Sequence, residues 1–184
     1  MAAPILKGGV RILRPCEYEA LREAAKKLEN QVKLDALLLT GLRYVEAQRL
    51  QMHPEWFDGR FINLPEHAQR KWKRKQRERW VRLNPLGQSI LPFFFKAKRL
   101  PSWKAWTLNL KRWAEWAGLD PVGLGPKTTR KTWESWLVTC YPQHLALICL
   151  SQGHTELTSL QYYLNMPFTE VDKLEMRKWV EGWV

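Results

Sequence analysis

Hydrophobic residues recur every three or four positions along most of the chain, with charged and polar residues between them. This period is that of an amphipathic α-helix, whose apolar face packs on a core. In the first such segment the apolar positions are Tyr18, Leu21, Ala25 and Leu28. The segments whose pattern predicts helices are residues 16–28, 32–41, 44–52, 86–98, 102–118, 127–140, 143–153, 157–165 and 169–183.

Two of these predicted helices carry residues suited to their ends. Gly41 follows a long apolar run and is expected to be a C-cap, because glycine adopts the left-handed conformation without strain. Ser102 precedes a periodic segment and is expected to be its N-cap, where a hydroxyl can accept a backbone hydrogen bond.

A different pattern appears between about Gly59 and Asn84. Residues 59–65 and 77–84 are short runs of strand-forming residues that flank a polar, basic segment, so they predict a β-hairpin or a small three-stranded sheet. The expected fold class is therefore mainly α with a small antiparallel β-sheet. We expect one domain over residues 1–184, in which residues 1–14 are an N-terminal extension or linker and residues 169–183 are the C-terminal helix.

The amino-acid composition indicates what kind of partner the protein binds. The 184 residues are 45% hydrophobic, enough to bury a core, and 30 Lys and Arg against 18 Asp and Glu give a net charge of +12. Such a positive field favours a polyanion, and nucleic acid is the first candidate. No apolar run approaches the length of a bilayer span, and the N-terminus lacks the apolar core of a secretory signal, so we expect a cytoplasmic location together with DNA.

Cysteine and tryptophan narrow the chemistry further. The three cysteines are odd in number and lack CxxC spacing, so neither a disulfide framework nor a zinc site is indicated, and we expect no metal and no cofactor. The 11 tryptophans include two pairs at helical spacing, which favours core packing over base stacking. These pairs are Trp106 with Trp113, and Trp133 with Trp136.

Three segments carry candidate chemistry. Arg43 follows a Thr-Gly-Leu turn, Lys127 and Arg130 stand three apart at the start of a predicted helix, and "GHTELTSLQYY" places Tyr163 nine residues after His154. Taken singly, each has an ordinary interpretation. Arg43 is typical of a surface arginine, and Lys127 with Arg130 of a solvated basic first turn. His154 is typical of a helix-capping histidine, and Tyr163 of an aromatic residue packed in the core. A basic first turn opposes the helix dipole unless an anion lies there, so that segment favours a bound phosphate.

In this order, the three segments resemble the arginine box, the HxxR box and the GH…Y box of the tyrosine recombinases, the integrases that cut and rejoin DNA through a tyrosine. The resemblance covers residues 17–183, and the wording "TTRKTWESWL" and "QGHTELTSLQYY" is most similar to the archaeal and archaeal-virus branch. It implies the fold of that family's catalytic domain and a site-specific recombinase acting on double-stranded DNA, as a dimer or tetramer on its site.

The resemblance also implies roles for the residues. Arg43 and Arg130 would bind the scissile phosphate, for which a planar guanidinium that stays charged is well suited. Tyr163 would be the nucleophile and form a 3′-phosphotyrosyl intermediate, with His154 beside it, whereas Tyr162 would lie on another helix face and pack. Such an ester conserves the energy of the bond, so resealing would need neither ATP nor metal.

A lysine of the hairpin would protonate the departing 5′-oxygen. Lys73 is the expected residue because it shortly precedes "RWVRL", and Lys71 and Lys75 stay open. The surrounding basic run could be a flexible charged loop that becomes ordered on the DNA backbone. The residues expected to bind DNA there are Arg70, Lys71, Arg74, Lys75 and Arg77.

The sequence departs from the family in two ways. Lys127 stands where most members have histidine, and a charged lysine cannot readily accept a proton, so the base for Tyr163 is open. The second departure is length: we expect these residues to form the catalytic domain without the separate N-terminal DNA-binding domain of most members, and an excised domain and a minimal protein are both compatible with this. Two rival functions are a type IB topoisomerase-like relaxation of DNA and a non-catalytic basic DNA-binding module.

Overall fold

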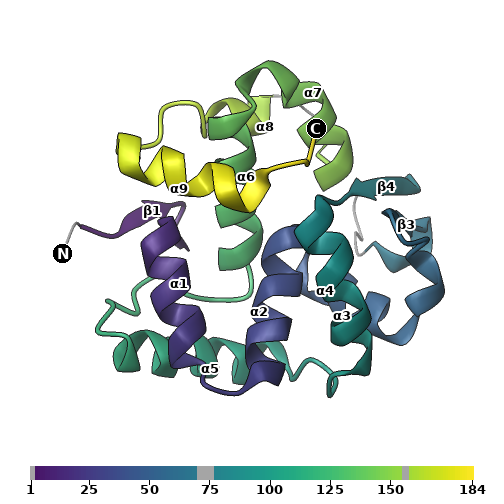
Figure 1. Cartoon of the computed structure of the whole chain (residues 1–184), viewed down its shortest axis with the longest axis horizontal. Coiled ribbons are helices and arrows are strands. Elements are labelled where there is room, and N and C mark those ends of the chain that lie inside the picture. Colours follow the sequence, from purple (N-terminus) through teal and green to yellow (C-terminus); the bar gives the residue numbers. More distant parts are fainter. Residues whose placement is uncertain (1–2, 70–76, 155–157) are drawn as a thin grey trace.

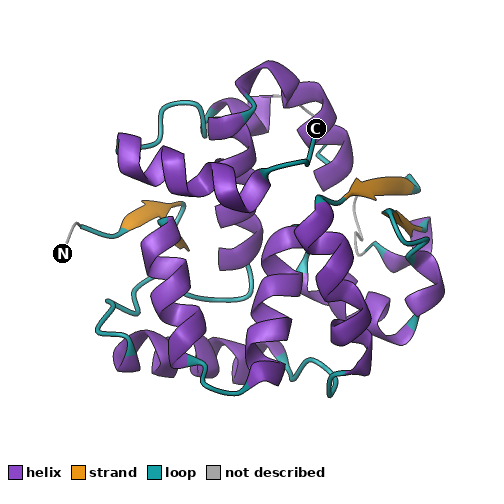
Figure 2. Cartoon of the chain, viewed as in Figure 1, coloured by secondary structure: helices purple, strands orange, loops and turns teal. Residues whose placement is uncertain are grey.

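A computed structural model describes residues 3–69, 77–154 and 158–184, with only the backbone of residues 158 and 159. Helices dominate it, as expected, and two short hairpins complete it (Figures 1 and 2). The helices are α1 (Pro15–Ala24), α2 (Leu28–Thr40), α3 (Tyr44–Met52), α4 (Pro85–Lys96), α5 (Trp103–Trp116), α6 (Thr128–Cys140), α7 (Leu145–Gln152), α8 (Thr158–Gln161) and α9 (Glu170–Val180). Short 3-10 turns span Pro54–Trp56, Glu66–Ala68 and Pro142–His144.

Two antiparallel hairpins lie on opposite sides of the molecule (Figure 1). The expected one pairs β3 (Phe61–Leu64) with β4 (Arg79–Arg82). The other pairs β1 (Ile5–Lys7) with β2 (Val10–Ile12), in the segment that the sequence assigned to an extension or linker. Its residues are too few to show a strand pattern by themselves, and contacts with α6 hold them in place.

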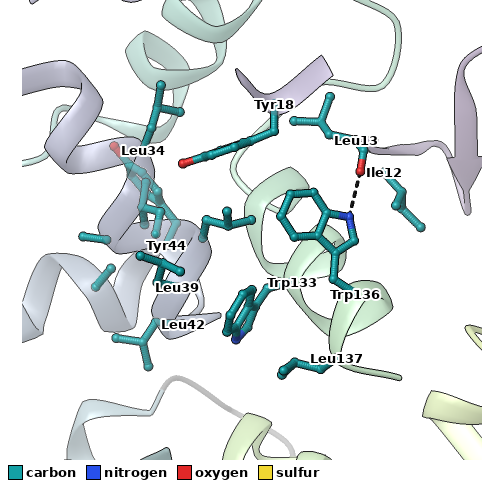
Figure 3. Close-up of a cluster of buried hydrophobic side chains, with 14 of the residues drawn as sticks. Ile12, Leu13, Tyr18, Leu34, Leu39, Leu42, Tyr44, Trp133, Trp136 and Leu137 are labelled. Atoms are coloured by element: carbon teal, nitrogen blue, oxygen red, sulfur yellow. Dashed lines mark hydrogen bonds between the residues drawn. The ribbon is translucent and has the colours of Figure 1, made fainter. Parts of the chain in front are cut away.

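Helix α6 is the centre of the fold, because it contacts β2, α2, α7 and α9 (Figure 1). Its side chains Trp133, Trp136 and Leu137 are fully buried. The Trp136 indole donates a hydrogen bond of 3.0 Å to the backbone oxygen of Leu13, and this bond ties the end of the N-terminal hairpin to the core (Figure 3). A central helix that begins with a candidate phosphate-binding arginine thus fixes that residue on a rigid element.

The predicted ends of two helices are confirmed. Gly41 adopts a left-handed φ of 59° after α2, and the Ser102 hydroxyl accepts a hydrogen bond from the Ala105 amide at the start of α5. The first helix is shorter than expected. It ends at Ala24 because the chain turns at Lys26, which has a φ of 48°, and Leu28 is consequently exposed at the start of α2.

Both tryptophan pairs expected in the core are buried there, which confirms the packing interpretation for them. Trp106 and Trp113 contact each other edge to face, with ring centroids 5.5 Å apart. Among the described tryptophans, Trp80, Trp103 and Trp116 are exposed instead. Within the described residues, no helix has the length and apolar character needed to cross a bilayer.

Candidate active site

Arg130 lies in the first turn of α6 and is 8% exposed. Its Nη1 donates to the backbone oxygen of Gly41 at 2.9 Å, and its Nη2 donates to that of Gln152 at 2.6 Å. These carbonyls lie at the C-terminal ends of α2 and α7, where the helix dipole concentrates negative charge. Arg130 is therefore anchored from two sides, and its guanidinium has one fixed position in the site.

Arg43 is the N-cap of α3 and is less enclosed than Arg130. Its Nη1 pairs with Glu46 at 2.7 Å, and its Nη2 donates to the backbone oxygen of Gly153 at 3.3 Å. The side chain is 28% exposed, so some of its five N–H donors stay available to a ligand. Arg43 thus presents a charged fork that is held on one side and open on the other.

Glu46 binds a second arginine, Arg79 of β4, through both of its oxygens, at 2.9 and 3.2 Å. Burial alone would raise the pKa of Glu46, but Arg79 and then Arg43 offset it and hold the pKa at about 2. The Arg79 Nε also donates to the backbone oxygen of Ser151. Arg79 is buried and holds β4 against α3 and α7.

Glu134, one helical turn after Arg130, joins three of the site residues and was not singled out by the sequence. Its Oε1 lies 2.9 Å from Nη2 of Arg130 and 2.8 Å from Nε2 of His154, and its Oε2 accepts a hydrogen bond of 3.3 Å from the Tyr163 hydroxyl. The i, i+4 spacing from Arg130 is the one signal that could have indicated it. Burial raises the pKa of Glu134, and Arg130 and His154 more than offset this effect and lower it.

Tyr163 follows α8 and is 3% exposed, with its hydroxyl directed at Glu134. Burial, and then the charge and hydrogen bond of Glu134, raise the pKa of Tyr163 well above its usual value. The ammonium of Lys7, from β1, lies 3.5 Å from the centre of the Tyr163 ring. Tyr162 was expected to pack, and that expectation is wrong: its side chain is 73% exposed, because the backbone after α8 turns and leaves Tyr163 as the inward residue.

One pocket of about 690 Å³ is lined by Arg43, Glu46, Arg130, Glu134, His154 and Tyr163. Lys127 is exposed at the N-terminus of α6, and its neighbour Lys131 donates to the backbone oxygen of Lys7 at 2.9 Å. The pocket lining thus combines four cationic side chains, those of Arg43, Lys127, Arg130 and Lys131, with the phenol of Tyr163. Such a set can bind a phosphate ester and present a nucleophile to it. The pocket-lining residues that the sequence indicated are Arg43, Lys127, Arg130, His154 and Tyr163.

The remaining predicted residues do not join this pocket. Lys73, with its alternatives Lys71 and Lys75, lies outside the described residues, and so do Arg70 and Arg74. Arg77 is exposed just before β4 and is absent from the pocket lining. Across residues 3–69, 77–154 and 158–184, no group of three or more His, Cys, Asp or Glu side chains is placed to hold a metal ion.

Two solved structures resemble this chain over almost its whole length. One is the crystal structure of XerA recombinase, with a TM-score of 0.64, 16% identity, and coverage of 98% of this chain and 69% of the XerA chain. The other is XerH site-specific recombinase bound to palindromic difH substrate in a post-cleavage complex, with a TM-score of 0.61, 19% identity, and coverage of 96% and 54%. This chain has the fold of a tyrosine recombinase catalytic domain.

No family model and no curated protein sequence matches the chain. At such low identity the likeness to the two recombinases establishes the fold, and the predicted fold class is confirmed by it. Within this recombinase fold, the pocket collects residues from α3, α6 and the segment after α7. Their roles in catalysis stay predictions.

Proposed function

We propose that this chain is a site-specific DNA recombinase or integrase that cuts and rejoins duplex DNA through a 3′-phosphotyrosyl intermediate on Tyr163. One observation carries the proposal: the Tyr163 hydroxyl shares a single pocket with Arg43, Arg130 and His154, which come from distant segments. The recombinase fold supports it independently of these side chains.

The pocket supplies the charge that attack on a phosphodiester requires. Negative charge grows on the non-bridging oxygens during the reaction, and preorganised cations stabilise it without reorganisation. Arg130 is suited to this task because two backbone carbonyls fix it, and Arg43 because one edge of it is open. Lys127 adds a third cation from the exposed rim. In this proposal Lys73 protonates the departing 5′-oxygen.

The proposal extends to the origin of the protein, its location and its oligomeric state on DNA. The wording of the second and third boxes favours an integrase of an archaeal virus or mobile element, acting in the cytoplasm of its host. Exchange of strands between two DNA sites requires more than one nucleophile, so we expect dimers or tetramers to form on DNA. XerH is a recombinase in complex with its DNA substrate, which supports duplex DNA as the partner.

Covalent trapping on a nicked suicide substrate tests the proposal. The wild-type chain should become linked to DNA, Tyr163→Phe should bind DNA without linkage, and the matched control Tyr162→Phe should retain linkage, because Tyr162 is exposed beside the site. Linkage should persist in EDTA, since arginines take the place of a metal. Linkage by Tyr163→Phe, or none by the wild type, would contradict the proposal, and the latter result would favour a DNA-binding module.

Two further measurements separate the rivals. Strand exchange between two sites distinguishes a recombinase from a topoisomerase-like enzyme, which would relax supercoils without exchanging partners. DNA affinity should fall steeply with salt, because Lys and Arg contacts to phosphates release counterions. A flat salt dependence would count against DNA as the main partner.

A further inference from the structure

Lys127 has no proton-accepting atom while it is charged, so the base that activates Tyr163 has to be sought elsewhere in the site. We propose that Glu134 accepts the phenol proton of Tyr163 and is a catalytic residue, an inference that rests on the proposed function of the pocket. The proposal assigns a role to the carboxylate at the centre of the site.

Geometry is the first argument. The Tyr163 hydroxyl donates its hydrogen bond to Oε2 of Glu134 at 3.3 Å, so the proton to be removed already points at this oxygen. The distance is slightly long, as is common for catalytic hydrogen bonds before substrate is bound. Glu134 is 2% exposed and lies on the rigid helix α6, and its other oxygen is held by Arg130 and His154.

The other residues close to Tyr163 are poorly placed or unsuited to accept this proton. Arginines stay charged and have no acceptor atom, which excludes Arg43 and Arg130. His154 directs Nε2 at Glu134, 2.8 Å away, and Lys7 lies over the face of the ring. Within the part of the chain that the structure describes, Glu134 is the acceptor bonded to this hydroxyl.

The same contacts favour the protonated form of Tyr163 while no DNA is bound. Arg130 and His154 lower the pKa of Glu134 against the effect of burial, while burial and the Glu134 charge raise the pKa of Tyr163. The phenol therefore keeps its proton. A phosphate that enters the pocket shares Arg130, weakens its hold on Glu134 and makes the carboxylate a stronger acceptor. Other titratable groups that face Glu134 are Lys7 of β1, Lys131 of α6 and Cys149 of α7.

In the proposed step the attacking oxygen loses one proton and the leaving oxygen gains one. The Tyr163 oxygen forms a bond to phosphorus while its proton moves to Oε2 of Glu134, and the bond from phosphorus to the 5′-oxygen breaks. The proposed hairpin lysine gives that oxygen a proton. Resealing runs the same steps in reverse, so Glu134 returns the proton to the phenol.

The test is single-turnover formation of the covalent complex on a suicide substrate with a 5′-bridging phosphorothiolate, a leaving group that needs no acid. Glu134→Gln keeps the size and polarity of the side chain but cannot accept a proton. We expect it to slow linkage by roughly 10²–10⁴-fold near neutral pH, the usual contribution of a general base. Its rate should then rise by about tenfold per pH unit, as an unaided phenol ionises. Glu134→Asp should recover part of the rate.

Two outcomes would overturn the inference while leaving the proposed function intact. One is linkage by Glu134→Gln at the wild-type rate or faster, as expected if Glu134 only neutralises Arg130. The other outcome is measured on the wild type. Its linkage rate should be nearly constant from about pH 6 to 9, because the Glu134 carboxylate is already ionised in this range. A wild-type rate that rises about tenfold per pH unit, as for a phenol without a base, would exclude Glu134. Wild-type protein that never links to DNA would instead refute the proposed function.

Discussion

Two buried carboxylates organise this site, and their partners differ in kind. Glu46, on α3, is fully buried and contacts two arginines and the Arg43 backbone amide. Glu134, on α6, is almost as buried but contacts one arginine, one histidine and one phenol. An arginine side chain stays protonated and charged at any working pH, whereas histidine and tyrosine side chains are able to exchange a proton.

From this difference we expect Glu46 to have a structural role and Glu134 to take part in proton transfer. Glu46 is locked in one ionisation state, so it fixes the positions of Arg43 and Arg79 and with them the start of α3 and strand β4. Glu134 is joined to groups whose protonation can change, so its environment can respond to a phosphate. Substitutions at the two carboxylates should consequently affect different measurements.

The largest expected effect is on stability. Glu46→Gln removes the charge that pairs with two arginines, of which Arg79 is buried, and breaking such a buried pair costs roughly 3–5 kcal/mol. Urea unfolding followed by circular dichroism measures the loss. Glu134→Gln is the matched comparison and should lose less, because Arg130 keeps its two carbonyl partners. An equal loss in both variants would remove the distinction between the two carboxylates.

The next effect is on covalent linkage to DNA. Arg130→Ala should slow linkage by roughly 10²–10³-fold, since it removes a preorganised donor to the phosphate. Arg49→Ala is the matched control, because Arg49 also donates to backbone carbonyls, those of His67 and Ala68, but is absent from the pocket lining. Single-turnover kinetics give both rates. Similar rates for the two variants would place Arg130 outside the chemistry.

The contribution of ionised Glu46 to the free energy of unfolding should depend on pH in the acid range. Its pKa is about 2 in the folded chain against 4.5 for a free side chain, so its stabilising contribution is present above about pH 4.5 and is lost as pH falls toward 2. The shift corresponds to about 3 kcal/mol of unfolding free energy. We expect the stability difference between wild type and Glu46→Gln to shrink over this window, and a constant difference would contradict the assigned cause.

A smaller effect is expected at the rim of the pocket. Lys127→Ala should slow linkage by roughly tenfold, as expected for the loss of one exposed cation near a phosphate. Lys127→His should be tolerated, because histidine can also donate a hydrogen bond to the phosphate. The defect of Lys127→Ala should also weaken as salt rises. A wild-type rate for Lys127→Ala would show that this lysine is a solvated surface residue without a role in linkage.

The smallest effect concerns Lys7. Its ammonium lies over the Tyr163 ring, where we expect it to stabilise a phenolate that forms during the reaction, and cation–π contacts of this kind contribute about 0.5–2 kcal/mol. Lys7→Met retains most of the packing volume and should slow linkage by only a few fold, without the steep pH dependence expected of Glu134→Gln. Rates of the two variants over a pH series make the comparison. A pH slope in Lys7→Met would move the proton acceptor to Lys7.

The sequence by itself determined the helical fold, the β3–β4 hairpin and the predicted residues Arg43, Arg130, His154 and Tyr163, because helical period, cap residues and short motifs are local patterns. The tertiary structure alone decided that Tyr163 is enclosed and Tyr162 exposed, and that Arg79 supports the fold. It also placed Lys7 and Glu134 against the Tyr163 side chain. Lys7 and Tyr163 lie near opposite ends of the chain, and Glu134 looks like any polar helix residue until the turn after α8 brings a phenol against it. Contacts of this kind depend on how α6, α8 and the N-terminal hairpin pack together, and no local pattern encodes that packing.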